Sequence, residues 1–255
     1  MSCHFNQILS ILKITKPQHF FKLISSPHNT IRKIKYHYRR VPERNFMEFF
    51  ANKLMCSAGD LDSVYEDYAN KRKVWDEIGD KLSAYPSGYG QQMTRELPIL
   101  YLSVRLLKPN LIVETGVSSG ASSAFILEAL HDNAKGHLYS IDLPPDNIPE
   151  GKESGWIVPE YLRSRWKLLI GNSKVILKPL LEDLKEIDCF IHDSLHTYEH
   201  MSWEFKTAWN HLRRGGLFLS HDVGANDAFL DFADKNETSV SDYRVFHVLG
   251  GFLKL

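Results

Sequence analysis

The stretch from Asp188 to His200, DCFIHDSLHTYEH, is rich in side chains that transfer protons or bind metal ions. Three histidines, two aspartates and one glutamate occupy its thirteen positions. The stretch begins as an apolar strand, in which successive side chains point to opposite faces, so His192 and Asp193 diverge. The four-residue spacing of the histidines therefore does not place three imidazoles around one zinc ion. We expect His192 to be a half-buried sheet residue and His200 to lie on a helix surface.

Asp193 ends its strand, and a second acidic tip, His221-Asp222, ends a strand further along the chain. Carboxylates on two neighbouring strand tips can share a divalent cation, with water molecules completing its coordination shell. An imidazole at position 221 suits a transition metal better than Mg²⁺. His196 has two alternative roles. It is either a general base, because an unperturbed imidazole titrates near neutral pH, or a residue that caps the following helix.

These residues lie within an alternation of short apolar strands and amphipathic helices that begins near residue 90. The expected strands cover residues 111–115, 137–144, 166–171, 188–193 and 217–222, and the expected helices cover residues 96–107, 120–130, 173–184, 197–212 and 226–235. Such an alternation predicts a doubly wound α/β fold, in which helices cover both faces of a parallel sheet. Two glycine pairs are expected to break this pattern. Gly215-Gly216 would end a helix, and Gly250-Gly251 would form the two-residue turn of a C-terminal hairpin.

The first 89 residues differ from the rest of the chain. Residues 45–83 are predicted to be helical, and the stretch SAYPSGYG, residues 83–90, predicts a boundary between an N-terminal region, 1–89, and a main domain, 90–255. Residues 1–42 contain eight Lys and Arg and no acidic residue. This basic arm either contacts an anionic membrane surface or nucleic acid, or belongs to a helical layer whose basic face meets solvent or the acidic segment that follows, and these alternatives remain open.

Polar residues follow every expected parallel strand, at the sheet edge where doubly wound folds bind ligands. The first of them opens a glycine turn, ETGVSSGASS, residues 114–123. Its glycines allow close approach of the backbone to a ligand, and the following helix points its N-terminal amides at the same place. The spacing G-x-x-x-G differs from the G-x-G-x-x-G of dinucleotide folds and suits a ligand without a pyrophosphate. Asp142, at the end of the second strand, can accept hydrogen bonds from both hydroxyls of a ribose.

With these motifs in order, residues 90–255 resemble class I S-adenosylmethionine (SAM)-dependent methyltransferases. VETGVSSGASS is similar to the first motif of that family, YSIDLP to the second, and LLIGNSKVIL to the turn beside the adenine. The resemblance implies a mostly parallel, seven-stranded sheet with a reversed last strand pair. Residues 1–89 lie outside the resemblance, and their own pattern adds an N-terminal helical extension to the expected fold. The resemblance also implies a set of SAM-binding residues: Glu114, Gly116, Ser118, Gly120, Ser122, Asp142, Asn172 and Ser173.

The motifs D-x-x-H-x-Y and GG-x-x-x-x-HD, which begin at Asp193 and Gly215, resemble metal-dependent small-molecule O-methyltransferases and the methyltransferase-24 type of domain. The resemblance implies that Asp193, His221 and Asp222 bind Mg²⁺ or another divalent cation, although many relatives have an acid in place of His221. It implies Asp193 and His196 as catalytic residues. The expected reaction is O-methylation of a small hydroxylated acceptor, such as a sugar or natural product, with no nucleic-acid partner.

Two other functions remain open. Some relatives of the metal-bearing type are described as cephalosporin-hydroxylase-like, and a histidine with carboxylates can hold the non-haem iron of an oxygenase. The other alternative is a non-catalytic module of the same fold, tethered by the basic arm.

Composition limits the class of protein further. Thirty-one Lys and Arg balance thirty-one Asp and Glu, so the net charge indicates no polyanionic partner. Three scattered cysteines without CxxC spacing argue against a disulfide framework or a thiolate zinc site. No stretch reaches the roughly 18 uninterrupted apolar residues of a membrane span, and the cytoplasm is the expected location. The oligomeric state is open, a homo-oligomer included.

Overall fold

The structure is a computed structural model, and it describes residues 36–85, 93–144, 148–236 and 242–255. The chain divides into two compact units, Met1–Arg40 and Val41–Leu255. Only residues 36–40 of the first unit are described, so the expected basic arm lies almost entirely outside the described residues. The fold below is that of the second unit.

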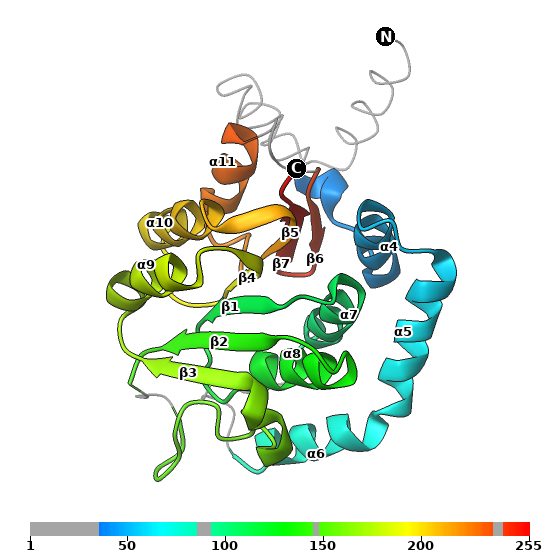
Figure 1. Ribbon diagram of the computed structural model, residues 1–255, viewed down its shortest axis with the longest axis vertical. Coiled ribbons are helices and arrows are strands. Elements are labelled where there is room, and N and C mark those ends of the chain that lie inside the picture. Colours follow the sequence, from blue (N-terminus) through cyan, green and yellow to red (C-terminus); the bar gives the residue numbers. More distant parts are fainter. Residues whose placement is uncertain (1–35, 86–92, 145–147, 237–241) are drawn as a thin grey trace, which may run out of the picture. The chain divides into compact units, whose positions relative to one another are not determined.

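A seven-stranded sheet forms the centre of this unit (Figure 1). Its strands are β1 (Leu111–Thr115), β2 (His137–Asp142), β3 (Trp166–Ile170), β4 (Ile187–His192), β5 (Leu212–Ser220), β6 (Arg244–Phe246) and β7 (Leu249–Leu253). They lie in the order β3-β2-β1-β4-β5-β7-β6. The pairs among the first five are parallel, whereas β7 runs antiparallel to both β5 and β6. The doubly wound, mostly parallel fold is confirmed, and its strand order reverses between β1 and β4.

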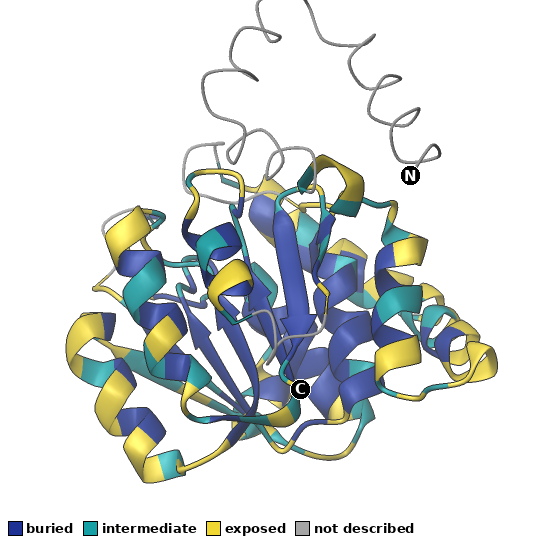
Figure 2. Ribbon diagram, turned by 90° about the horizontal axis from the view of Figure 1, so that it is seen from above, coloured by how far each residue is buried: buried dark blue, intermediate teal, exposed yellow. Residues whose placement is uncertain are grey.

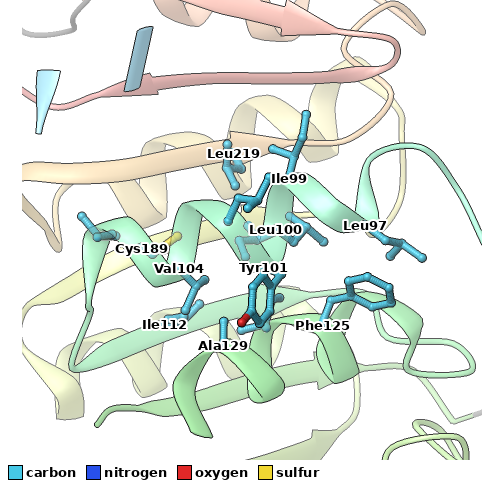
Figure 3. Close-up of a cluster of buried hydrophobic side chains, with 14 of the residues drawn as sticks. Leu97, Ile99, Leu100, Tyr101, Val104, Ile112, Phe125, Ala129, Cys189 and Leu219 are labelled. Carbon is cyan, nitrogen blue, oxygen red and sulfur yellow. The ribbon is translucent and has the colours of Figure 1, made fainter. Parts of the chain in front are cut away.

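Helices cover both faces of the sheet. They are α4 (Glu43–Lys53), α5 (Ala58–Asn70), α6 (Arg72–Ser83), α7 (Leu97–Leu107), α8 (Ala121–Asp132), α9 (Ser173–Leu184), α10 (Tyr198–Trp209) and α11 (Ala228–Lys235), with a 3₁₀ turn, η1, at Glu160–Arg165. Side chains alternate along each strand, so one face of β1 and β4 packs on α7 and α8 through Ile112 and Cys189 (Figure 3). The other face meets α10 and α11, where Phe218 contacts Phe205 and Phe232. The central strands are therefore buried, whereas the edge strand β3 is partly exposed and the helices keep exposed outer faces (Figure 2).

The helices of the N-terminal layer belong to the same compact unit as the sheet. Phe46, Phe50 and Trp75 are buried and join the core formed by α7 and α8. Ser57 begins α5 with a capping box, in which its side chain accepts from the amide of Asp60 and the Asp60 carboxylate accepts from the amide of Ser57. The expected boundary at residues 83–90 falls largely outside the described residues, and the division at residue 89 stays a prediction.

Both predictions about glycine pairs are wrong. Helix α10 already ends at Trp209, and Gly215-Gly216 lie inside β5, where the pairing with β4 is irregular. Gly215 has a φ of 72°, a backbone conformation that glycine adopts without strain.

The turn of the C-terminal hairpin lies at His247 and Val248, and His247 takes the positive φ, 54°. Gly250 and Gly251 are strand residues of β7. A Cβ on Gly251 would lie only 2.6 Å from the Cδ2 atom of Leu219, so glycine is needed here for close packing between β7 and β5.

No helix among the described residues is long and apolar enough to cross a membrane.

Candidate functional site

The glycine turn between β1 and α8 forms one side of a cavity of about 490 Å³ at the C-terminal edge of the sheet. Five of the eight residues expected to bind SAM line this cavity, namely Gly116, Ser118, Asp142, Asn172 and Ser173. The amide of Ser118 donates to the Asp142 carboxylate at 3.0 Å, which joins the glycine turn to the end of β2. The side chain of Asn172 caps α9 by accepting from the amide of Lys174. The structure thus brings the ends of β1, β2 and β3 together around one cavity.

The two glycines of the turn serve close backbone packing. Gly116 has a φ of 87°, and a Cβ there would lie 2.0 Å from the carbonyl oxygen of Asp193. A Cβ on Gly120, whose φ is 93°, would lie 2.7 Å from the Cα atom of Gly155. Gly116 lies in the wall of this cavity, whereas Gly120 lines neither this cavity nor the second one described below.

Glu114 lies beneath the turn, where it is completely buried. Its carboxylate accepts hydrogen bonds from the hydroxyls of Ser122, Ser123 and Ser140, at 2.6, 2.6 and 2.7 Å. Burial raises the pKa of Glu114 to about 7, although the three hydroxyls act in the opposite direction. Glu114 lines neither the cavity above nor the one described next. Its expected contact with SAM stays a prediction, and the geometry favours a supporting role under the turn.

A second cavity, of about 290 Å³, adjoins the first. Ser122 and all four residues expected to bind metal or transfer protons line it, namely Asp193, His196, His221 and Asp222. The two cavities share part of their lining, formed by residues 116–118 and Asp193. We call these four residues the shared wall.

Asp193 is the centre of a compact group of side chains in the second cavity. His221 Nδ1 lies 3.1 Å and His196 Nε2 lies 3.4 Å from Asp193 Oδ1, while His196 Nδ1 lies 3.4 Å from Asp222 Oδ2. Burial alone would raise the pKa of Asp193, but His196 and His221 outweigh it and hold the pKa below its ordinary value. Burial likewise opposes protonation of His221, yet Asp193 and Asp222 raise its pKa above the ordinary value.

This group fits a divalent cation. One donor atom each from Asp193, His196 and His221 lies within 4.8 Å of the other two. His196 Nε2 and His221 Nδ1 are buried, and neither has a well-aligned hydrogen bond to any described residue. Buried polar atoms ordinarily have partners, and a cation would supply one. The donor set differs from the expected one, because His196 stands in it and Asp222 lies at its margin.

The other two histidines of the opening stretch are not where we expected them. His192 is completely buried and His200 is 7% exposed, so the predicted half-buried and surface positions are wrong. Both imidazoles hydrogen-bond to Glu204 of α10, at 2.7 and 2.8 Å, and this buried acid is what draws them inward. The cap of α10 is Thr197, whose hydroxyl accepts from the amide of His200. His196 is therefore not the capping residue.

Sequence reasoning missed Glu96, which lines the second cavity, and His247, which hydrogen-bonds to it. Glu96, just before α7, lines the cavity and is 3% exposed. Burial opposes its ionisation, but a hydrogen bond from His247 outweighs this and holds the pKa of Glu96 below its ordinary value. The only sequence signal was an acid directly before a strongly apolar helix, which is also an ordinary helix start.

A third cavity, of about 480 Å³, lies at the opposite edge of the sheet beside Asp188 and Arg213. These two side chains form an ion pair, and Asp188 also accepts from the amides of Asn110 and Leu111. Their hydrogen bonds are satisfied within the fold, so this cavity shows no sign of the chemistry found at the other edge.

A glycine turn after β1, an acid at the end of β2 and a reversed final strand pair together define the class I methyltransferase fold. Comparison with protein families is more specific. Residues 113–223 match the model of a methyltransferase domain, the methyltransferase-24 type. This region of the chain is therefore similar to a methyltransferase domain of this type, and the resemblance seen in the sequence is confirmed. None of the curated proteins matches the chain.

Two solved structures, those of Podospora anserina and Geobacter sulfurreducens, agree on the fold. The SAH-bound methyltransferase PaMTH1 of Podospora anserina aligns with a TM-score of 0.54 at 15% identity, over 74% of this chain and 96% of that one. A methyltransferase of Geobacter sulfurreducens aligns with a TM-score of 0.50 at 17% identity, over 64% and 79%. The O-methyltransferase TomG of Streptomyces achromogenes, solved with SAM, aligns at 0.46 with 19% identity, over 61% and 78%.

Proposed function

We propose that this protein is a SAM-dependent O-methyltransferase that acts on a hydroxyl group of a small acceptor. One observation carries the proposal: a cavity beside Asp142 and a cavity beside Asp193, His196 and His221 meet at a shared wall. The first has the chemistry to hold a nucleoside, and the second has the chemistry to deprotonate a hydroxyl. Methyl transfer requires such an adjacency, because donor and acceptor must be aligned within a few ångströms.

In the first cavity, the Asp142 carboxylate accepts hydrogen bonds from the ribose hydroxyls. Asn172 and Ser173, at the start of α9, stand on the adenine side, and residues 116–118 face the methionine part. Bound there, SAM would supply an electrophilic methyl group, and its transfer to an acceptor oxygen would break the bond between the methyl carbon and the sulfur and release S-adenosylhomocysteine. The shared wall directs this end of the cofactor toward the second cavity.

In the second cavity, His196 is the general base. Its Nε2 atom faces Asp193 and its Nδ1 atom faces Asp222, each at 3.4 Å, so a proton taken by either nitrogen lies beside a carboxylate. The sugar-like or natural-product-like nature of the acceptor and the absence of a nucleic-acid partner remain predictions.

Asp193 and His221 would hold a divalent cation, with Asp222 or His196 as a further ligand. A bound cation lowers the pKa of a coordinated hydroxyl. The mixed oxygen and nitrogen donors suit Mn²⁺ or Fe²⁺ better than Mg²⁺. A neutral imidazole has only one unprotonated nitrogen, so His196 could not both ligate a cation and accept a proton, and its role as a base would require that the cation use Asp222 instead.

The proposal is tested by calorimetric titration of SAM into metal-stripped protein, then with Mg²⁺ or Mn²⁺ added. The wild-type protein is expected to bind, and Asp142→Ala to bind at least about tenfold more weakly, since hydrogen bonds to a charged group contribute about 1.5–3 kcal/mol. Asp183→Ala removes the same charge from the exposed surface of α9 and should bind like the wild type. Transfer of a labelled methyl group to a panel of catechols, sugars and glycosylated natural products then identifies the acceptor. No SAM binding under any condition would refute the proposal and leave the glycine turn with a packing role alone.

A second candidate function is an iron-dependent oxygenase. Two histidines and one carboxylate, His196, His221 and Asp193, form the convergent donor group. This is the ligand set of many non-haem iron oxygenases. Tight Fe²⁺ binding with oxygen consumption, in protein that does not bind SAM, would favour this function over methyl transfer.

The remaining predictions concern the surroundings of the enzyme. A cytoplasmic location, a membrane contact through residues 1–42 and a homo-oligomeric state stay predictions. The basic arm lies almost entirely outside the described residues, so the tethered, non-catalytic alternative stays untested. Lipid co-sedimentation of the full chain, compared with a variant that lacks residues 1–42, would test the membrane contact.

A further inference from the structure

Glu204 is a buried carboxylate beneath the site, and it lines neither of the two cavities. It is completely buried in α10 and accepts four hydrogen bonds. Thr115 and His192 donate to Oε2 at 2.6 and 2.7 Å. His200 and Ser194 donate to Oε1 at 2.8 and 3.0 Å. A buried charge is stable only when such partners surround it, so the loss of one acceptor oxygen leaves donors unpaired.

The shared wall has two segments, residues 116–118 and Asp193, and three of the donors to Glu204 are direct sequence neighbours of these segments. Thr115 is the last residue of β1 and directly precedes Gly116. His192 and Ser194 are the neighbours of Asp193 on either side. A hydrogen bond also joins the two strand ends directly, because the amide of Asp193 donates to the carbonyl of Thr115 at 2.8 Å. Glu204 therefore hydrogen-bonds to residues that directly flank both segments of the wall.

The same carboxylate reaches the residues that line the two cavities. His200 lines the cofactor cavity, and its Nε2 atom lies 3.2 Å from the hydroxyl of Ser173 at the start of α9. On the other side, the ring of His192 packs edge-on against the ring of His196, with centroids 5.4 Å apart. Burial alone would raise the pKa of Glu204, but His192 and His200 outweigh it and hold the pKa well below its ordinary value. Glu204 is thus an ionised acceptor, and both imidazoles donate to it.

We propose that Glu204 is a positioning residue that fixes the cofactor cavity relative to the acceptor cavity by hydrogen-bonding to the residues that directly flank both segments of their shared wall. The inference rests on the proposed SAM-binding function. It assigns Glu204 no contact with substrate. Its role is to keep Asp193 and His196 aligned with the methyl donor, and misplacement by about 1 Å can reduce the rate of such a reaction about a hundredfold.

Histidine-ring nitrogen NMR with SAM tests this without a known acceptor or metal. In the wild-type protein, we expect His192 to carry its proton on Nδ1 and saturating SAM to shift the ring signals of His196 and His221 through the shared wall. Glu204→Gln keeps the shape of the side chain but replaces one acceptor oxygen with an amide donor. It should still bind SAM by calorimetry, lose the Nδ1 signature of His192, and lose the SAM-dependent shifts of His196 and His221.

The matched control is Glu128→Gln. Glu128 is also a buried glutamate, 2% exposed, but its partners Lys71 and Tyr161 lie away from both cavities. This variant should show the wild-type response to SAM, and if it loses the response too, the effect is a general loss of order and the proposal is overturned. If Glu204→Gln does not fold, Ser194→Ala tests the proposal instead, because it removes only one of the four donors to Glu204. SAM-dependent shifts of His196 and His221 that equal those of the wild type would then overturn the proposal.

The two proposals fail in different ways. A wild-type protein that does not bind SAM refutes the proposed function, and this inference falls with it. SAM binding without any shift of His196 or His221, or with the same shifts in Glu204→Gln, overturns only the positioning role.

Discussion

Glu114 allows a prediction whose sign and size both follow from its surroundings. The carboxyl group is completely buried, and the three serine hydroxyls described above hydrogen-bond to it. Burial therefore raises its pKa to about 7 from the model-compound value of 4.5. The perturbation that isolates this group is Glu114→Gln, which keeps the shape of the side chain but cannot ionise.

A raised pKa in the fold means that the folded state binds its proton more tightly than the unfolded chain. The stabilisation from this proton is complete below pH 4.5 and is lost as the pH rises through about 7. At about 1.4 kcal/mol for each pH unit between the two values, the wild-type protein loses about 3 kcal/mol of unfolding free energy from this group. The variant loses none of it.

The assay is urea denaturation of both proteins between pH 4.5 and pH 8. The free energy of unfolding of Glu114→Gln, minus that of the wild type, should rise by about 3 kcal/mol across this range, because all other titrating groups cancel in the difference. Ser122→Ala removes one hydroxyl that lowers the pKa of Glu114, so it should move the wild-type transition to higher pH. A difference between Glu114→Gln and wild type that stays constant from pH 4.5 to pH 8 would show that Glu114 is already ionised in the fold, and the reasoning would be refuted.

Three further predictions concern packing, capping and the cation. Gly251→Ala should lower the unfolding free energy by about 1–3 kcal/mol in denaturant titrations, because the new Cβ would lie 2.6 Å from Leu219. A midpoint equal to that of the wild type would contradict this account of the hairpin. Thr197→Ala removes the cap of α10 and should cost about 1 kcal/mol in the same assay, whereas a loss of zero would mean that the cap is dispensable. Asp193→Asn should weaken Mn²⁺ binding, followed by electron paramagnetic resonance, at least about tenfold, and unchanged affinity would exclude Asp193 as a ligand.

The sheet could be predicted from the sequence because its strands carry a strong local signal. LIVET and DCFIH are short, nearly continuous apolar runs bounded by turn residues, and only a strand buried on both faces requires such a run. The helix predicted at 173–184 coincides with α9, because Asn172 is a good cap and its apolar positions recur at helical spacing. The parallel order of the strands then placed their polar ends at one edge, and residues 142, 193 and 222 do line cavities there.

The glycine pairs show where local signals fail. A glycine is favoured both by a turn that needs positive φ and by a strand that another element approaches closely, and the residue type does not distinguish the two. Gly215 is of the first kind, within an irregularity of β5, and Gly251 is of the second. The contact between Leu219 and β7 shows that Gly251 is of the second kind. This contact joins residues far apart in the sequence, so no local pattern indicates it.

The buried histidines were misplaced for a different reason, because the decisive signal lay in another element. Met201, Phe205 and Ala208 form the buried stripe of α10, and Glu204 lies on the same stripe. A carboxylate at such a position must find donors inside the fold, and His200, one turn earlier on the helix, is the nearest candidate. The strand that α10 packs against must supply the rest, which leads to His192, the polar residue that alternation places on that face of β4. An acid within an apolar helical stripe thus indicates that nearby histidines are buried, and here it also identifies the residue that supports both sides of the site.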